Sequence, residues 1–471
     1  MAADLTADPS LTSNRNKEQP IMTTSRAAAA VAAAALTALG LAACSDDEPD
    51  DGRTHITVTI DAGLEQDAID AFDKRIEQFE EANPDIAVER QEYTWTAGTF
   101  TAQLAGGTLP DVFVVPFTDG RGLIERGQIA DIGDLTAELP YRDSYNPNIA
   151  AAGEDPEGDM WAIPIAAYGQ GLHYNRTLFE AAGLDPDAPP TTWAEVRTAA
   201  DTISAETGEA GYAVMTNDNT GGWILTTVVN ALGGRTDDGA GTATIDTPAM
   251  RQALEDLQAM RWEDESMGDN FLYDWAGINQ DFASGRIGMY VSGGGNYGNL
   301  FTQNALNPDD YGLTVLPLAD DPNSGVLGGG TLAAVSPDAE ADEAAAAVEW
   351  IDFYYMEKLT VQEAAVADAE VKAETGQPVG APELPVFDKA TYDEVQTWIA
   401  EYVNVPVEQM APYTGQVFDQ PLLNEPTVAT QEVYAVLDTV VQTVLTEEDA
   451  DVDALLETAQ TEAQAAIDAA A

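Results

Sequence analysis

The chain has 471 residues, of which 45% are hydrophobic, and 82 acidic residues outweigh 19 basic ones to give a formal net charge of −63 at pH 7. A negative field of this size repels phosphate backbones and anionic lipid surfaces, so the composition argues against nucleic acid and such membrane surfaces as partners. The acidic residues are spread along the whole chain, which favours a solvated acidic surface over a local cation-binding cluster.

The first part of the chain resembles an export signal. Arg26 precedes an uncharged, mostly alanine run at 27–41, which is shorter than the ~20 residues of a membrane-spanning helix and is typical of a signal peptide. Cys44, the only cysteine, follows the small residues at the end of this run, and residues 41–44 resemble a bacterial lipobox. The resemblance implies that Cys44 is lipidated and becomes the first mature residue. The alternative is a plain signal peptide that ends beside a cysteine.

Composition divides the chain into a leader, a tether and a folded part. We expect the leader and signal peptide at 1–43, with translation starting at Met22, and an acidic, solvated tether at 44–53. The remaining residues are numerous enough for two globular lobes with separate cores.

Short β-branched runs alternate with amphipathic stretches from residue 54 onward, which is typical of an α/β domain. In chain order, the pattern predicts a strand at 55–60, a helix at 67–82, a strand at 86–91, a helix around 100–104 and strands at 112–115, 162–166 and 171–174. Helices are predicted at 176–182, from Trp193 onward, and at 249–262, 339–357 and 452–470. Thr192 and Glu195 form a capping-box pattern for the helix that begins at Trp193.

Signals for catalysis are weak along the chain. The only histidines, His55 and His173, both lie in strand-like contexts, so neither indicates a nucleophilic triad or a zinc site. A G-x-G-x-x-G pattern at 293–298 stands far from the start of any βαβ unit and does not indicate a dinucleotide cofactor. The acidic turn at 153–159 lacks the spacing of a calcium loop. We therefore predict no catalytic residue, metal or cofactor.

Aromatic side chains beside polar residues in loop-like stretches are more informative. Sugar recognition needs flat rings that stack on C–H groups and polar side chains that bond to hydroxyls. This pattern selects Trp95, Phe117 with Asp119, Tyr168, Trp223, Trp275, Asn296 and Tyr297 as candidate ligand contacts. For any one of them, the alternative is a partly buried loop aromatic.

Several stretches, taken in order, resemble family 1 of the extracellular solute-binding proteins, the sugar-binding lipoproteins of ABC importers. The matching stretches are 106–113 (GGTLPDVF), 159–165 (DMWAIPI), 174–184 (YNRTLFEAAGL), 190–195 (PTTWAE), 282–289 (FASGRIGM) and 328–336 (GGGTLAAVS). Each stretch alone is modest, and their order makes the set specific.

The resemblance implies an α/β, two-lobe periplasmic-binding-protein fold of type II, with mixed sheets flanked by helices. One lobe would comprise 54–164 and 318–377, and the other 165–317 and 378–471. The chain would cross between them three times. We expect the crossings at 164–167, 315–318 and 377–381, where a Pro or Gly stands at the edge of a lobe.

The resemblance also implies a ligand cleft between the lobes. Positions that contact the ligand in the family can be matched one by one to residues of this sequence. Asp61 ends the first strand, Phe117 and Asp119 follow the strand after 110–111, and Tyr168 lies past the first crossing. Trp223 matches an aromatic position of the second lobe. The chain departs from the family at 293–297, where a stacking indole is usual and Tyr297 is the nearest ring.

These patterns together predict a non-catalytic solute receptor tethered by its lipidated N-terminus to the outer face of the cell membrane. It would bind a mono- or oligosaccharide as a monomer and deliver it to ABC transporter permease subunits. Three alternatives stay open at this point: an exported glycoside hydrolase, a receptor for a cationic or peptide solute, and a sensory receptor.

Overall fold

A nine-stranded mixed sheet is the framework of the residues that the computed structural model describes, namely 51–470 apart from 65, 383 and 427. The strands are β1 (Thr54–Asp61), β2 (Ile86–Tyr93), β3 (Val112–Pro116), β4 (Ile163–Asn175), β5 (Ala210–Ala213), β6 (Ile287–Gly293), β7 (Tyr311–Val315), β8 (Val326–Val335) and β9 (Leu422–Leu423). Their order is β2-β1-β3-β8-β4-β6-β5, with β7 beside β4 and β9 beside β8. Parallel and antiparallel pairs both occur, which confirms the predicted α/β class with a mixed sheet.

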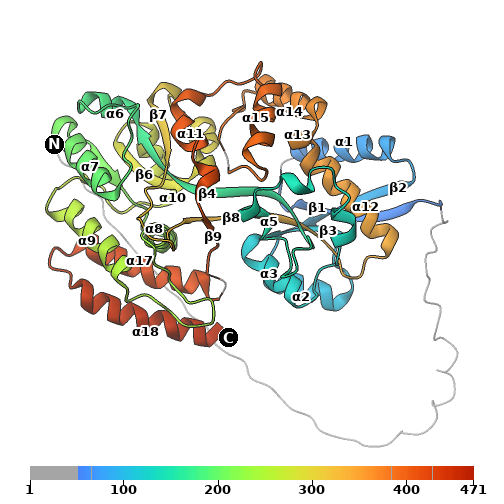
Figure 1. The fold of residues 1–471 in the computed structure, drawn as a ribbon, viewed down its shortest axis with the longest axis horizontal. Coiled ribbons are helices and arrows are strands. Elements are labelled where there is room, and N and C mark those ends of the chain that lie inside the picture. The colour runs from blue at the N-terminus through green and yellow to red at the C-terminus, as the bar shows by residue number, and fades with distance from the viewer. Residues whose placement is uncertain (1–50, 65, 383, 427, 471) are drawn as a thin grey trace, which may run out of the picture. The chain divides into compact units, whose positions relative to one another are not determined.

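Helices flank this sheet (Figure 1). They are α1 (Gln66–Ala82), α2 (Ala97–Gly106), α3 (Phe117–Glu125), α4 (Gly133–Thr136), α5 (Pro147–Ala150), α6 (Arg176–Ala181), α7 (Trp193–Thr207), α8 (Thr220–Ala231), α9 (Pro248–Trp262), α10 (Trp275–Ala283), α11 (Tyr297–Asn304), α12 (Ala341–Ile351), α13 (Glu357–Thr360), α14 (Gln362–Glu374), α15 (Lys389–Trp398), α16 (Ala411–Thr414), α17 (Thr430–Thr446) and α18 (Val452–Ala470). Short 3₁₀ turns span Arg142–Ser144, Gly294–Asn296, Pro308–Asp310, Val407–Met410 and Val417–Asp419. Among the described residues, the helices are all too short or too polar to cross a membrane. The leader and Cys44 lie outside the described residues.

Two long strands, β4 and β8, are shared by two groups of elements. We call the elements around β1, β2 and β3 the first lobe, and those around β5, β6 and β7 the second lobe. The beginning of β4 pairs with β8, and its end pairs with β6 and β7 (Figure 1). The beginning of β8 pairs with β9, and its end pairs with β3.

The structure corrects one prediction about β4. The sequence predicts two strands, at 162–166 and 171–174, with a break between them where Ala167 and Gly169 have low β-propensity. The backbone instead continues as one strand of 13 residues, with a register shift between Pro164 and Ala166. β8 pairs with residues 167–169 and β6 pairs with Gln170, so the ladder continues through this stretch and overrides its low β-propensity.

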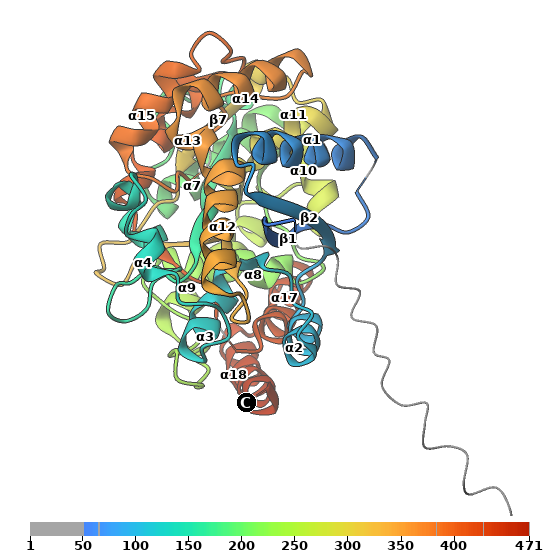
Figure 2. The same cartoon turned by 90° about the vertical axis from the view of Figure 1, so that its right-hand side faces the viewer.

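In the first lobe, α1 and α12 cover the sheet (Figure 2). Phe72 and Phe79 of α1 contact the indole of Trp350 edge-on, with ring centroids 5.7 and 5.3 Å apart. The helix predicted at 339–357 is present, but it is not a regular α-helix throughout: α12 ends at Ile351, and a π-helical turn spans Asp352–Met356 before α13 begins at Glu357. The Tyr141 hydroxyl donates to the Asp352 carboxylate at 2.7 Å and holds the start of this turn, a tertiary contact that helical periodicity does not register.

In the second lobe, α8 and α17 pack with almost no space between their backbones. A Cβ on Gly222 would lie 2.3 Å from the Tyr434 carbonyl oxygen, so glycine is required there. The carboxylate of Asp438 in α17 accepts hydrogen bonds of 2.7 Å from the backbone N–H groups of Asn219 and Gly222. One helix therefore caps the N-terminus of the other, where the exposed N–H groups and the helix dipole favour an acceptor.

The core of the second lobe contains His173 of β4, which is fully buried. Its Nε2 lies 3.1 Å from the Gly293 carbonyl oxygen, and its Nδ1 lies 2.9 Å from the Tyr311 hydroxyl. A carbonyl only accepts, so Nε2 carries the proton and Tyr311 donates to Nδ1. Burial lowers the pKa of His173 from 6.5 to about 4, because the charged ring would lose its solvation. The histidine is thus a neutral core residue.

We predict that His173 makes the protein less stable as the pH falls. Its folded-state pKa of about 4 lies below the unfolded value of 6.5, so its contribution is present above pH 6.5 and is lost as the pH falls toward 4. At ~1.4 kcal/mol per pH unit, the loss reaches about 3 kcal/mol. Urea unfolding at pH 7, 5.5 and 4 should show this extra loss in the wild type relative to His173→Gln. Parallel pH profiles for the two proteins would contradict the assignment.

Candidate functional site

A run of three glycines at 328–330 lies in β8 where the two lobes meet. In the ladder with β4, Gly329 is opposite Tyr168, and a Cβ on Gly329 would lie 2.7 Å from the Tyr168 hydroxyl oxygen. A Cβ on Gly330 would lie 2.5 Å from the ring of Phe117. Successive strand residues point to opposite faces, so the two rings approach β8 from opposite faces. The glycines let both rings lie directly on the strand.

Tyr168 lies near a carboxylate that the sequence does not single out. Glu425 contributes to raising the pKa of Tyr168, although burial of the ring is the larger cause. The Tyr434 hydroxyl donates to Glu425 at 3.1 Å. Burial raises the pKa of Glu425, and this hydrogen bond from Tyr434 opposes the rise. A half-buried carboxylate that accepts a hydrogen bond from one phenol is well suited to accept further hydrogen bonds from a hydroxylated ligand.

A pair of indoles belongs to the same lobe, and one of them stands on α8, the helix that packs against α17. Gly222 packs on Tyr434, and the next residue, Trp223, stands in the first turn of α8. Its ring lies 6.4 Å from that of Trp275, the first residue of α10, with an angle of 49° between the planes. Trp275 is 40% exposed and Trp223 is partly buried. The second lobe therefore holds two partly exposed indoles beside each other, one of them on the helix that packs against α17.

The candidates of the first lobe are spread over the ends of its parallel strands. Asp61 is exposed at the end of β1 and contributes to raising the pKa of Tyr355, for which burial is the main cause. Trp95 lies after β2, stacked parallel to Phe113 with centroids 6.5 Å apart. Asp119, in the first turn of α3, accepts a hydrogen bond of 3.1 Å from the Thr118 hydroxyl.

Asn296 and Tyr297 lie deeper than the sequence pattern indicates. The amide of Asn296 donates to the Asn279 side-chain oxygen at 2.8 Å and to the Tyr290 hydroxyl at 2.9 Å. Tyr297 is fully buried and stacks on Phe301 at 5.9 Å. Both side chains are engaged in the core of the second lobe, and their role as ligand contacts stays a prediction.

Of the nine candidates, Trp223 and Trp275 lie beside each other in the second lobe. Tyr168 lies on β4 where it pairs with β8, near Glu425 and Tyr434. The missed residues belong to a segment, 422–434, that has no motif of its own. Glu425 is one of 82 acidic residues, and only its tertiary position distinguishes it.

Comparison with known proteins identifies related sequences. A family model described as bacterial extracellular solute-binding protein matches residues 62–359. The sn-glycerol-3-phosphate-binding periplasmic protein UgpB of Agrobacterium fabrum is 26% identical over 239 residues, which cover 47% of this chain and 52% of that protein. A probable amino-acid ABC transporter periplasmic-binding protein of Sinorhizobium fredii is 29% identical over 192 residues, 38% of this chain and 40% of that one. The chain thus spans about half the length of the first of these relatives and 40% of the length of the second.

Solved structures share the fold over nearly their full length. The cyclic alpha-maltosyl-1,6-maltose binding protein from Arthrobacter globiformis has a TM-score of 0.67 at 23% identity, covering 88% of this chain and 99% of that one. UgpB from Mycobacterium tuberculosis, in complex with glycerophosphocholine, has a TM-score of 0.65 at 19% identity, covering 89% and 99%. These likenesses confirm the predicted two-lobe periplasmic-binding-protein fold.

We predict that Gly329→Ala displaces the Tyr168 ring and destabilises the protein by ~1–3 kcal/mol, as overpacking does. In the Tyr168→Ala background the same change should cost much less, because the clash is removed. Urea unfolding of the single and double variants measures this coupling. Gly293→Ala is the matched control, since a Cβ there meets nothing within 4 Å. Equal costs in both backgrounds would show that Tyr168 does not rest on Gly329.

Proposed function

Because the chain belongs to the bacterial extracellular solute-binding protein family, we propose that it captures a neutral sugar in a cleft between its lobes and passes it to an ABC transporter permease. In this proposal the protein is a receptor without catalytic activity. Binding of the sugar would bring the lobes together, and the permease would recognise the closed form.

The arrangement of Tyr168, Glu425 and the Trp223–Trp275 pair is the observation that carries this proposal. Aromatic faces stack on the apolar C–H side of a sugar, and a carboxylate accepts hydrogen bonds from its hydroxyls. Tyr168 lies on Gly329 of β8, Glu425 follows β9, which pairs with β8, and α8 with Trp223 packs against α17. The remaining candidates complete the proposed ligand contacts: Asp61, Trp95, Phe117, Asp119, Asn296 and Tyr297.

The charge of the chain favours a neutral sugar over a phosphate ester. The UgpB relatives are named for binding sn-glycerol-3-phosphate, which is an anion. Here the net charge is −63, and the site contains Glu425. The negative charge of Glu425 would repel a phosphate group bound beside it. A phosphorylated ligand would therefore bind more weakly than an uncharged one of similar size.

The lobe bounds expected from the sequence, 54–164 with 318–377 and 165–317 with 378–471, stay part of the proposal, and the pairing of the long strands β4 and β8 adjusts two of the crossings. The partner strands of β4 change from β8 to β6 and β7 between Gly169 and Gln170, which favours a first crossing slightly later than 164–167. For the second crossing, the change of partners along β8, from β9 to β3, favours a position within β8, later than 315–318.

The lipidated anchor is the remaining part of the proposal. The lipobox-like residues 41–44 support acylation of Cys44, and the acidic tether 44–53 would hold the lobes above the outer face of the cell membrane. The protein would act as a monomer, with the permease as its membrane partner.

The proposal is tested first by a thermal-shift screen of the purified protein against mono- and oligosaccharides, amino acids, polyamines and glycerol 3-phosphate. A higher melting temperature with one sugar class, and no turnover of that sugar, is the expected result. Stabilisation by polyamines or amino acids alone would exclude the sugar. Hydrolysis of a chromogenic glycoside by the pure protein would replace the receptor with an enzyme.

For the sugar that the screen finds, Tyr168→Ala and Trp223→Ala should each weaken binding by ~1–3 kcal/mol, because each removes a stacking face. Isothermal titration calorimetry measures the change. Trp161→Ala is the control: its indole N–H donates to Asp155 at 3.1 Å, outside the proposed site. Unchanged affinity in a folded Tyr168→Ala protein would remove Tyr168 from the site.

Replacement of Cys44 should release the protein from the membrane, because the thiol is the only attachment point for the lipid. We expect Cys44→Ser protein in the soluble fraction of the producing bacterium and no incorporation of labelled palmitate, whereas the Ser45→Ala control stays in the membrane fraction and is labelled. A wild-type protein that is soluble and unlabelled would disprove lipidation.

A further inference from the structure

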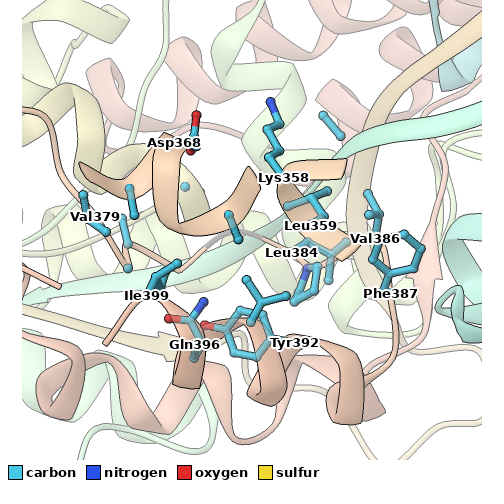
Figure 3. A pocket seen from close by; sticks show the side chains of 18 of the residues that line it. Lys358, Leu359, Asp368, Val379, Leu384, Val386, Phe387, Tyr392, Gln396 and Ile399 are labelled. Carbon is cyan, nitrogen blue, oxygen red and sulfur yellow. The ribbon is translucent and has the colours of Figure 1, made fainter. Parts of the chain in front are cut away.

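A cavity of about 320 Å³ lies where β4 passes α13, α14 and α15 (Figure 3). We call it the inner cavity. It is lined by residues 165–167 of β4, by Gly295 and Gly298, and by residues 378–381 of the loop before α15. None of the nine candidate sugar contacts lines it. An apolar cavity of about half this volume is large enough to hold a benzene ring.

One wall of the inner cavity is apolar. It is formed by the side chains of Ile165, Leu384, Phe387, Val395 and Ile399. Leu384 and Phe387 are only 5% and 3% exposed, so packing fixes their positions. An apolar group that enters this space would be removed from water, at about 25 cal/mol per Å² of apolar surface buried. The Phe387 ring adds a partner for an aromatic ligand, since two rings attract each other beyond the area that they bury.

The charged side chains of the inner cavity offer no free charge to a ligand. The Asp368 carboxylate is paired with the ammonium of Lys372 at 2.7 Å, and both residues stand on α14. Lys358, the third charged residue of the lining, has an interaction of its own within the chain. A charged ligand would lose solvation in this space without gaining a free counter-ion, so the inner cavity favours an uncharged one.

Gln396 supplies a polar contact. Figure 3 shows it beside Tyr392, on the side of the inner cavity that faces Lys358 and Asp368. The Gln396 side chain is partly buried, and its amide has no hydrogen-bond partner among the residues that the structure describes. A primary amide both donates and accepts hydrogen bonds, which suits a hydroxyl group.

A second cavity, of about 350 Å³, adjoins the inner cavity and shares Gly380, Tyr392 and Gln396 with it. Its other lining residues are Pro382, Ala400, Val403, Val407, Met410 and Thr414. None of these side chains is charged, in a chain of which 21% of the residues are charged. Gln396 therefore stands between two spaces that both favour an uncharged molecule.

We propose that the inner cavity is a second ligand site, which takes a small uncharged molecule with an apolar ring and one hydroxyl group. The ring would lie against Leu384, Phe387 and Ile399, and the hydroxyl would bond to the Gln396 amide. Because the ligand would contact β4 and α15 together, it stabilises the conformations in which these elements enclose the cavity. The site is separate from the proposed sugar contacts.

Benzyl alcohol, benzoate and benzylamine share one ring and differ in charge, so they test the preference for an uncharged ligand. Ligand-detected NMR titrations in high salt, which screens the net charge of the chain, measure the three affinities. Benzyl alcohol should bind at least tenfold more tightly than either charged compound. Benzoate or benzylamine binding as tightly would overturn the proposal, as would the absence of benzyl alcohol binding at millimolar concentration.

Paired variants place the binding in the inner cavity. Ala369→Phe fills part of the space, because Ala369 lines it and is 2% exposed, and should lower the benzyl alcohol affinity at least tenfold. Ala367→Phe, on the exposed side of α14, should leave the affinity unchanged. Melting temperatures report whether each variant is folded.

Gln396→Leu gives a second test that needs no filling of the cavity. It should weaken benzyl alcohol binding at least threefold, as loss of a hydrogen bond does, and should not weaken the binding of toluene, which lacks the hydroxyl. Gln362→Leu is the matched control, since Gln362 is exposed and does not line the cavity. Equal losses for benzyl alcohol and toluene would overturn the hydrogen bond to Gln396.

Benzyl alcohol binding that neither Ala369→Phe nor Gln396→Leu weakens would overturn the proposal as a whole. Sugar binding is measured separately in the same variants, so failure of one site is distinguishable from failure of the other.

Discussion

The antiparallel pairing of β4 with β8 is the interaction on which both lobes depend. Each strand begins with one set of partners and ends with another, so the hydrogen bonds of the two lobes share one backbone ladder. Such a ladder satisfies the backbone groups of small residues that could not form a strand alone. It also fixes the glycines at 328–330, where any side chain would collide with Tyr168, Phe117 or Leu422.

The candidate sugar site follows from this constraint. Tyr168 lies on Gly329 because the register places the two residues opposite each other, and β9 beside β8 leads directly to Glu425. The capping of α8 by Asp438 then fixes the turn that carries Trp223. Each polar or aromatic group is thus held by backbone pairing or helix capping, which keeps the rings in place without a ligand. Such preorganisation reduces the entropy lost on binding.

The sequence predicted best those features that depend on neighbours along the chain. The helices expected at 67–82, 249–262 and 452–470 agree with α1, α9 and α18 to within one residue, because amphipathic periodicity and caps are local signals. The strands of the first lobe were also predicted. The features it missed depend on distant contacts: the continuity of β4, the π-helical turn held by Tyr141, and the pairing of Glu425 with Tyr434. Tyr297 was selected for its loop-like context, yet Phe301 and Tyr311 enclose its ring.

The aromatic groups of the candidate site are more specific than its carboxylate. In a chain with 82 acidic residues, carboxylates occur near almost any surface, so the presence of Glu425 alone says little about a ligand. Trp223 and Tyr168 are held in fixed positions, the first by the capping of α8 and the second by the glycines of β8. Stacking on a sugar needs flat rings that are fixed in this way, so these rings carry the argument for a sugar further than the charge does.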